Sequence, residues 1–245
     1  MNLVIDIGNT LVKAALFQEG EIKAQKTSAN LDMVESMIGE VQGSLNAAII
    51  SAVRDIPQEL AFLKNRDLFY LEASYATPTP VKNLYASPET LGMDRLAASI
   101  GGHHFFPGKQ LLVISAGTCL TYDRVTEAGE YLGGAISPGM QMRFKALNTF
   151  TGRLPLVKAE SQNVSLVGET TQKSILSGVI NGMVAEIDGT IDQYKKQHKD
   201  IQIIFSGGDI FFFDKMLKNR IFAIENIVLH GLNQILEYNA QHHSN

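Results

Sequence analysis

The sequence contains very little cysteine and lacks long apolar runs. Cys119 is the only cysteine among 245 residues, which excludes an intramolecular disulfide and is typical of a reducing compartment. No apolar run approaches the roughly 18 residues that a membrane helix requires. The chain opens with the strand-like run Leu3-Val4-Ile5 where a secretory leader would stand. We therefore expect a cytoplasmic protein with no membrane partner.

A strong positive charge is also missing. The formal net charge is -4, and the densest basic stretch, residues 195–199, lies at the end of an expected helix. Cations are favoured at a helix C-terminus, so we interpret this stretch as a solvated helix end and expect no nucleic-acid partner. The six histidines show no metal-ligand spacing, and we assign none of them to a metal site.

Two common nucleotide-binding motifs are absent. No Gly-Lys-Ser/Thr follows a spaced glycine, which excludes a Walker-type phosphate loop. No GxGxxG fingerprint follows a strand, which excludes the usual dinucleotide-binding unit. A nucleotide site in this chain must therefore be built on other turns.

What the sequence does contain predicts an α/β protein with a sizeable core. Hydrophobic residues make up 45% of the chain and charged residues 19%. A strand–turn–strand unit at the N-terminus recurs about 110 residues later, which suggests two similar halves, residues 1–108 and 109–245. The expected strands cover residues 3–5, 11–17, 47–53, 68–71, 110–114, 119–123 and 201–205, and the expected helices cover residues 33–38, 56–64, 92–100, 140–149, 174–194 and 227–239.

Two turns are candidates for binding phosphate. The turn Asp6-Ile7-Gly8-Asn9-Thr10 has a glycine that lets the backbone approach an anion, with Lys13 close behind it. A carboxylate such as Asp6 holds Mg²⁺ mainly through water. The turn Ser115-Ala116-Gly117-Thr118 repeats this pattern after a second buried strand. Each turn alone is better explained as an ordinary hairpin, but the pair favours a phosphate clamp.

Two further segments are candidates for catalysis or ligand binding. Gly92-Met93-Asp94-Arg95 places a carboxylate in the first turn of an expected helix, beside an arginine able to bind a carboxylate through two parallel hydrogen bonds. The alternative is a plain helix start with a surface ion pair. Ser206-Gly207-Gly208-Asp209 follows an apolar strand, and its paired glycines permit close approach of a flat ring such as adenine. A tight strand-to-helix turn explains the same residues.

Taken together and in order, these motifs resemble type III pantothenate kinases. The resemblance extends over nearly the whole chain, and the order and spacing of the motifs are more specific than any one of them. The stretches that carry it are DIGNT at 6–10, GMDR at 92–95, AGT at 116–118, GGAISPG at 133–139, LNTFTGRLP at 147–155, GETT at 168–171 and SGGD at 206–209.

The resemblance implies both a fold and an activity. The family has duplicated actin-like (ribonuclease H-like) ATPase domains, with mixed central sheets flanked by helices. Its members transfer the γ-phosphate of ATP to the primary hydroxyl of pantothenate, which is the first step towards coenzyme A. They are typically homodimers that require Mg²⁺ and a monovalent cation, K⁺ or NH₄⁺.

The resemblance also implies roles for individual residues. Asp94 would be the general base that accepts the hydroxyl proton, which suits a phosphoryl transfer that depends mainly on positioning. The ATP phosphates, with Mg²⁺ on Asp6 through water, would be held by Asp6, Ile7, Gly8, Asn9, Thr10, Leu11, Val12, Lys13 and Thr118. Pantothenate would be contacted by Tyr85, Gly92, Met93, Asp94, Arg95 and Thr171.

Ser115 departs from the family pattern. The family usually has an aspartate there, and that carboxylate is associated with the monovalent cation. A neutral serine hydroxyl coordinates a cation more weakly, and Asp123 lies too far along the strand to substitute directly. Either the cation is held otherwise, or its requirement is altered, or the activity is reduced.

Two alternatives remain open at this point. One is a kinase for a different small alcohol such as a sugar, because the resemblance alone names pantothenate. The other is a non-catalytic nucleotide-binding or regulatory protein, since some relatives of this family act as accessory factors in gene regulation. A panel of acceptors tests the first, and nucleotide binding without phosphoryl transfer favours the second.

Overall fold

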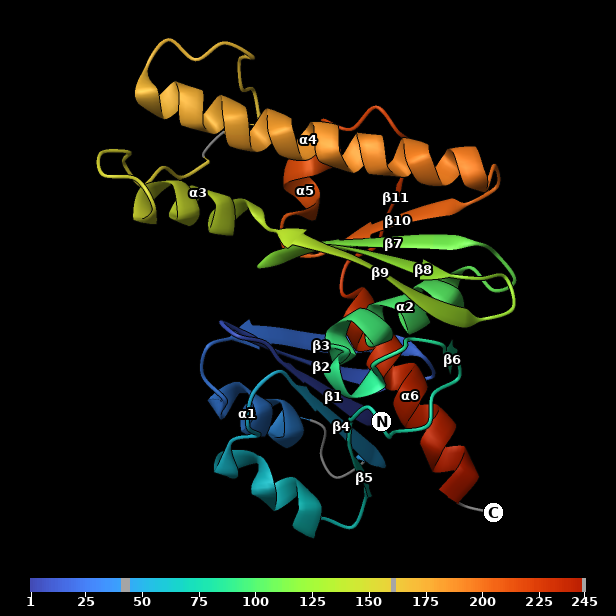
Figure 1. Ribbon diagram of the computed structural model, residues 1–245. Helices are drawn as coiled ribbons and strands as arrows, with labels where there is room; N and C mark the ends of the chain where they lie inside the picture. Colours follow the sequence, from blue (N-terminus) through green and yellow to red (C-terminus); the bar gives the residue numbers. More distant parts are fainter. Residues whose placement is uncertain (41–44, 160–161, 244–245) are drawn as a thin grey trace. The chain divides into compact units, whose positions relative to one another are not determined.

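The computed structural model describes residues 1–40, 45–159 and 162–243 (Figure 1). The chain divides into two compact units. The first unit comprises residues 1–108, 128–132 and 226–243, and the second comprises residues 109–127 and 133–225. The C-terminal segment 226–243 therefore clusters with the first unit. The predicted halves, residues 1–108 and 109–245, were defined by the recurring strand–turn–strand unit and not by contacts, so this division stays a prediction.

The first unit is built on a mixed five-stranded sheet. Its strands are β1 (Asn2–Ile7), β2 (Val12–Gln18), β3 (Glu21–Ser28), β4 (Ala47–Ala52) and β5 (Phe69–Glu72). They lie in the order β3-β2-β1-β4-β5. β1 is antiparallel to β2 and parallel to β4, which is parallel to β5. The apolar strands β1 and β4 lie inside the sheet, whereas the edge strand β3, which we did not predict, alternates exposed and half-buried residues.

Helices cover both faces of this sheet. They are α1 (Asp32–Glu40), η1 (Gln58–Asn65), α2 (Met93–Phe105) and α6 (Ile227–His243), and the short helix η2 (Pro88–Thr90) comes just before α2. Leu3, Ile5 and Ile7 of β1 pack into a core with α1 and η1. Side chains alternate along a strand, so Asp6 points to the opposite face. That face is contacted by α6, which packs in turn against α2.

The expected helix 92–100, which we predicted to end at the glycine pair 101–102, is too short, because α2 continues past these glycines. A Cβ atom at Gly101 would overlap the carbonyl oxygen of Ile227, and one at Gly231 would overlap the carbonyl oxygen of Ala97. These glycines therefore permit close packing of α2 on α6 and do not terminate the helix. Only the tertiary structure distinguishes the two uses of glycine.

The second unit is also built around a mixed sheet. Its strands are β7 (Leu111–Ala116), β8 (Cys119–Val125), β9 (Glu130–Pro138), β10 (Gln202–Ser206) and β11 (Phe222–Ala223). They lie in the order β11-β10-β7-β8-β9. β9 begins in the first unit, where its first two residues pair with β6 (Lys82–Asn83). β7 is antiparallel to β8 and parallel to β10, which is parallel to β11.

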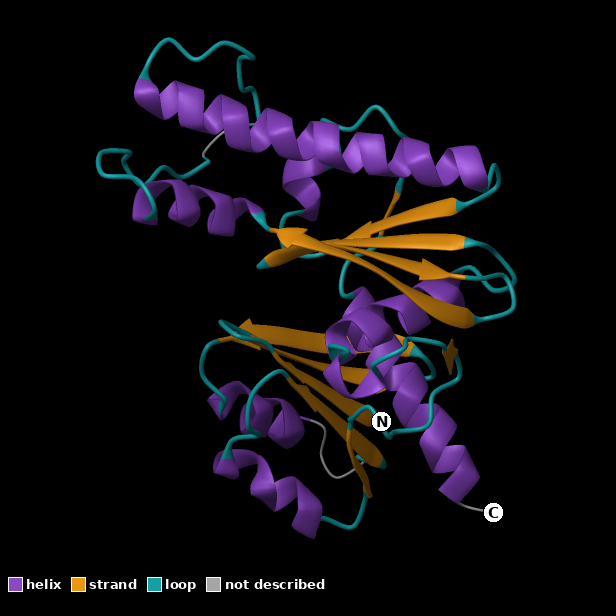
Figure 2. Ribbon diagram, in the orientation of Figure 1, coloured by secondary structure: helices purple, strands orange, loops and turns teal. Residues whose placement is uncertain are grey.

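Three helices gather on one side of this second sheet (Figure 2). They are α3 (Met140–Thr149), α4 (Thr171–Gln197) and α5 (Ile210–Phe213). Ile114 of β7, Phe144 of α3, Ile187 of α4 and Phe205 of β10 are fully buried in their shared core. The expected helix 140–149 is confirmed at both ends, and the expected helix 174–194 is confirmed within a longer α4.

The two sheets repeat the same topology. The order β9-β8-β7-β10-β11 matches β3-β2-β1-β4-β5, with the same parallel and antiparallel pairings around the central strands β7 and β1. The duplicated α/β fold predicted from the recurring strand–turn–strand unit is therefore confirmed.

The two candidate turns are shorter than we predicted. Asp6 still belongs to β1 and pairs with Lys13, and Ser115 still belongs to β7 and pairs with Thr121. Polar residues beside a glycine resemble a turn locally, but each residue here has a partner across an antiparallel ladder. Asp6 and Ser115 are therefore held by strands.

Candidate active site

The side chain of Asp6 lies in a polar row across the first sheet. Asp6 is in register with Lys13 on β2 and with Ser51 on β4. Partners in register point to the same face of a sheet. Ser51 is buried, and Asp6 and Lys13 are half-buried. Sequence reasoning missed Ser51, although a polar residue that follows the apolar run Ile49-Ile50 at the end of a buried strand is a usable signal.

The carboxylate of Asp6 is electrostatically unsatisfied. Burial, and after it the nearby carboxylate of Asp94, raise its pKa and the ammonium of Lys13 lowers it, so that the pKa moves from 3.8 to about 6. Two carboxylates therefore lie close to one ammonium. A divalent cation fits this arrangement, because it would neutralise the repulsion between the carboxylates.

The glycine turn after β1 is tight. The amide of Gly8 donates to the carbonyl of Leu11 at 3.0 Å, so this amide is already engaged. Asn9, Thr10 and Leu11 are exposed at the tip of the turn. A phosphate at this turn would therefore meet the tip residues and the polar row beneath them, and it would not meet a free Gly8 amide.

Asp94 is positioned by the start of α2. Gly92 is the residue before the helix, and its carbonyl accepts hydrogen bonds from the amides of Arg95 and Leu96 at 3.1 and 3.3 Å. A Cβ atom at position 92 would lie 2.5 Å from Oδ1 of Asp94. The carboxylate thus lies back against Gly92, which explains why a residue with no side chain precedes it. Met93 is buried, which anchors this first turn.

Arg95 and Tyr85 lie together. The Arg95 guanidinium carbon is 5.9 Å from the centroid of the Tyr85 ring. Tyr85 is half-buried and packs against Tyr131, with 6.1 Å between the ring centroids. Arg95 is only 7% exposed. The structure therefore brings together an arginine and a tyrosine that the sequence separates by a loop and η2.

In the second unit, Ser115 and Thr118 lie on the β7–β8 hairpin. Thr118 is exposed at its tip, and its carbonyl accepts a hydrogen bond from the amide of Gly139 at 3.1 Å. A Cβ atom at Gly139 would overlap the carbonyl oxygen of Gly117. The last glycine of the segment 133–139 therefore packs directly on this hairpin.

The glycine pair at 207–208 also packs on β7. Gly207 has φ +100, and a Cβ atom there would overlap the carbonyl oxygen of Ala116. The Asp209 amide donates to the same oxygen at 3.0 Å. Burial raises the pKa of the half-buried Asp209 carboxyl. These contacts explain the glycine pair by packing and leave the adenine assignment a prediction.

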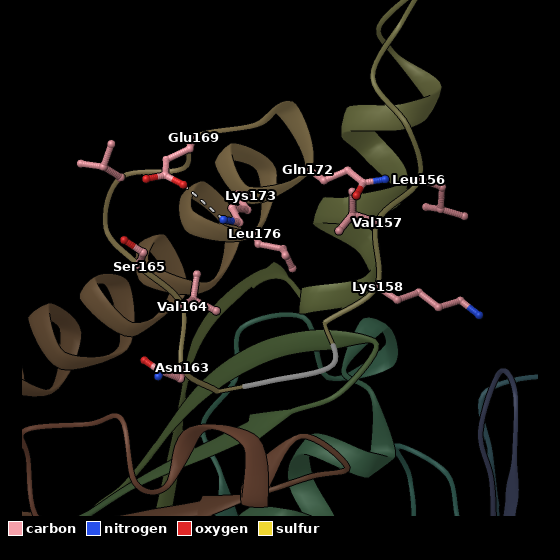
Figure 3. Close-up of a pocket in the computed structure, with 11 residues that line it drawn as sticks. Leu156, Val157, Lys158, Asn163, Val164, Ser165, Glu169, Gln172, Lys173 and Leu176 are labelled. Atoms are coloured by element: carbon pink, nitrogen blue, oxygen red, sulfur yellow. Dashed lines mark hydrogen bonds and ion pairs between the residues drawn. The ribbon is translucent and has the colours of Figure 1, made fainter.

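Thr171 begins the long helix α4. The preceding Thr170 caps the helix by accepting a hydrogen bond from the Lys173 amide at 3.2 Å, and Thr171 itself is exposed. A pocket of about 700 Å³ lies beside this first turn, lined by Glu169, Lys173 and aliphatic side chains such as Leu176 (Figure 3). Sequence reasoning did not predict this pocket.

The predicted site residues fall into three groups. The first unit brings together Asp6, Lys13 and Asp94, with Arg95 next to Asp94 in sequence. In the second unit Ser115 and Thr118 share a hairpin, while Thr171 lies on a different element.

Within residues 1–40, 45–159 and 162–243, no group of three or more His, Cys, Asp or Glu side chains is arranged to hold a metal ion. None of the helices described here has the length and apolar character needed to cross a membrane.

Known proteins are similar to this chain in sequence and in fold. Residues 2–193 match the family model described as type III pantothenate kinase. Type III pantothenate kinases from Christiangramia forsetii and Phocaeicola vulgatus are 43% and 45% identical to this chain, over 98% of this chain and 99% of each relative.

Two solved structures share the fold alone. A Campylobacter jejuni protein assigned to the Baf family of transcriptional activators has a TM-score of 0.62 at 21% identity and covers 98% of this chain and 99% of its own. A ROK hexokinase from Thermus thermophilus has a TM-score of 0.51 at 10% identity and covers 97% of this chain and 99% of its own. The fold is therefore the duplicated actin-like fold of sugar kinases. By the match over residues 2–193 and the near full-length identity to its relatives, the chain belongs to the type III pantothenate kinase family.

Proposed function

We propose that this chain transfers the γ-phosphate of ATP to the primary hydroxyl of pantothenate, giving 4'-phosphopantothenate in the first step of coenzyme A biosynthesis. Membership of the family supports this assignment. The observation that carries it in the structure is the cluster of Asp6, Lys13 and Asp94 in the first unit. Two carboxylates beside an ammonium provide a base and a charged cradle for a phosphoryl transfer.

Asp94 is the general base in this proposal. Its carboxylate is half-buried, lies against Gly92 and is close enough to Asp6 to influence its pKa. A base must reach the hydroxyl proton while remaining ionised. A cation bound at Asp6 would offset the repulsion between the two carboxylates.

On family resemblance, residues 6–13 and Thr118 would hold ATP and Mg²⁺. Mg²⁺ usually keeps several waters and uses only one or two carboxylates with substrate phosphates. When bound, Mg²⁺ would supply charge neutralisation, while Lys13 would add a cation facing the phosphates.

Pantothenate carries a carboxylate that needs a cationic partner, and Arg95, which lies beside Tyr85, would provide one. A guanidinium binds a carboxylate through two parallel hydrogen bonds, and a tyrosine hydroxyl adds a third donor. Gly92 and Met93 would line the same site, and Thr171 would contact pantothenate from the start of α4. A homodimer, a cytoplasmic location and K⁺ or NH₄⁺ as a further cofactor belong to the proposal on family resemblance alone.

The decisive experiment measures ADP release with ATP, Mg²⁺ and pantothenate, in separate K⁺, NH₄⁺ and tetramethylammonium buffers. We expect turnover that depends on pantothenate and forms a phosphorylated product with the mass of 4'-phosphopantothenate. The matched control is pantothenol, which keeps the primary hydroxyl and lacks the carboxylate, and we expect its KM to be far higher. A sugar that is turned over better than pantothenate would contradict the assignment. Nucleotide binding with no transfer in any buffer would instead favour a non-catalytic protein.

A further inference from the structure

The repeated sheets place a polar row at equivalent positions in each unit. In the first unit, Lys13, Asp6 and Ser51 lie side by side on β2, β1 and β4, and we call them the ionic row. It contains a cation and a carboxylate. The charge of Lys13 lowers the pKa of Asp6, and the charge of Asp94 raises it.

The second unit carries a hydroxyl row in the equivalent position. Thr121, Ser115 and Ser206 lie side by side on β8, β7 and β10. They share one face of the sheet, opposite to the face on which Ile114 and Phe205 enter the core. All three members of this row are neutral.

The topology makes Ser115 the counterpart of Asp6. β7 occupies the same place in its sheet as β1 does in the other, with the same pairing directions. Asp6 stands two residues before Gly8, and Ser115 stands two residues before Gly117, in the turn that follows each strand. By duplication, Ser115 is therefore the position where a second carboxylate would stand.

One member of the hydroxyl row has an unmet polar atom. Thr121 is 8% exposed, and its Oγ1 has no hydrogen-bond partner among the residues that the structure describes. Ser206 is 3% exposed. A buried hydroxyl without a partner is costly, so this atom is available to donate to a water or to an anionic oxygen of a ligand.

The hydroxyl row does not fit the monovalent cation that the family resemblance implies. K⁺ and NH₄⁺ are attracted by a carboxylate, whereas a hydroxyl offers an oxygen with no net charge. Asp123 lies two residues beyond Thr121 on the same face, but it is 1% exposed and already has an interaction partner. The amide of Asp209 donates to the carbonyl of Ala116, the residue that follows Ser115. Asp209 is therefore a nearby carboxylate, and an experiment must distinguish its effect on cation dependence from that of the hydroxyl row.

We propose that the hydroxyl row replaces a cation-binding carboxylate, so that this enzyme transfers phosphate without K⁺ or NH₄⁺. The inference rests on the proposed function. Hydroxyls, unlike a carboxylate, donate hydrogen bonds to an anionic oxygen without the help of a cation. The three hydroxyls therefore bind the anionic oxygen themselves, whereas a carboxylate would need a bound cation to do so.

The test compares turnover in K⁺, NH₄⁺ and tetramethylammonium at equal ionic strength, which removes general salt screening from the comparison. For the native chain, the rate in K⁺ divided by the rate in tetramethylammonium stays close to unity. For Ser115→Asp the same ratio rises roughly tenfold, which corresponds to about 1.4 kcal/mol of carboxylate–cation attraction. Ser115→Ala is the matched control, and its ratio stays at the native value whatever its absolute rate.

A second measurement does not depend on catalysis. Calorimetry gives the affinity for a non-hydrolysable ATP analogue with Mg²⁺ in K⁺ and in tetramethylammonium. The native chain shows the same affinity in both buffers. If no buffer supports turnover, the proposed function fails. The calorimetric affinities in the two buffers then still test whether nucleotide binding depends on the monovalent cation.

Three results would overturn the inference. The first is a native rate or nucleotide affinity that is several-fold higher in K⁺ or NH₄⁺ than in tetramethylammonium. The second is cation stimulation of the native chain that disappears in the Asp209→Asn variant, which would show that Asp209 is the carboxylate that binds the cation. The third is a folded Ser115→Asp protein with an unchanged ratio, which would show that position 115 is not next to a cation site. If Ser115→Asp does not fold, the native measurements remain decisive.

Discussion

Replacing Asp6 by asparagine changes the charge at the centre of the ionic row while keeping the shape of the side chain. In the native protein without ligands, burial and the neighbouring Asp94 hold the Asp6 pKa at about 6, against 3.8 for the unperturbed group. The folded state therefore binds this proton more tightly than the unfolded state does. Below about pH 4 both states are protonated, and the contribution of Asp6 to stability is fully present.

As the pH rises from 3.8 towards about 6, the unfolded chain loses the proton first, so the native state loses stability. Each pH unit in this window costs about 1.4 kcal/mol, and the whole window costs up to about 3 kcal/mol. Above about pH 7 both states are ionised, and the difference is constant. The Asp6→Asn protein has no such titration. Relative to the native protein, it should therefore gain up to about 3 kcal/mol of unfolding free energy between about pH 4 and about pH 7.

The assay is urea denaturation of both proteins without nucleotide or Mg²⁺, at several pH values between about 4 and about 8. The difference between the two unfolding free energies cancels most other titrating groups. In an Asp94→Asn background this pH-dependent difference should shrink without vanishing, because burial is the larger cause of the raised pKa. A difference that is flat with pH, or that favours the native protein as the pH rises, would refute the electrostatic account of the site. The same substitution should weaken binding of Mg²⁺-ATP, since the stabilised variant has lost the carboxylate that would hold the metal.

Three further predictions concern the remaining parts of the site. Asp94→Asn should lower kcat by about 10²–10⁴-fold with little change in nucleotide affinity, measured by ADP release and calorimetry, and near-normal turnover would exclude Asp94 as the base. Arg95→Lys should raise the KM for pantothenate far more than the KM for ATP, because an ammonium loses the two parallel hydrogen bonds, and equal changes in both would contradict carboxylate binding. Gly231→Ala should destabilise the first unit by about 1–3 kcal/mol in urea denaturation, because its Cβ overlaps Ala97 in the helix that carries Asp94. Gly182→Ala, in an exposed part of α4 where nothing lies within 4 Å of the new Cβ, is the control and should be neutral or stabilising.

Much of the secondary structure was predictable because its signals are local. The helix 140–149 and the buried strand at 47–53 are found where the apolar pattern indicated. The errors are also informative. Gly101 resembles a helix end, but it lies in mid-helix because α6 packs against it. β3 was missed because an edge strand with one exposed face carries charged residues at alternate positions and has little apolar pattern.

The candidate site was only partly predictable. Asp6 and Lys13 could be associated because they flank one short turn, whereas Tyr85 entered only through resemblance to the family. Its proximity to Arg95 depends on the path of the chain through η2, which no local pattern reveals. Ser51 and Thr121 were overlooked, since each is a single polar residue in an apolar strand, and Ser206 was predicted only as part of the turn 206–209.

By itself, the sequence determined the duplicated α/β organisation, the ordered motifs of the family and the presence of Ser115 where an aspartate is usual. These are properties of short segments, and apolar periodicity, glycine and charge report them directly. Only the tertiary structure decided which distant residues share a face: Asp6 with Lys13 and Ser51, and Ser115 with Thr121 and Ser206. The reason is that strand register is set by hydrogen bonds between segments up to about a hundred residues apart in the chain. The electrostatic environment of a carboxylate is likewise set by whatever the fold brings beside it.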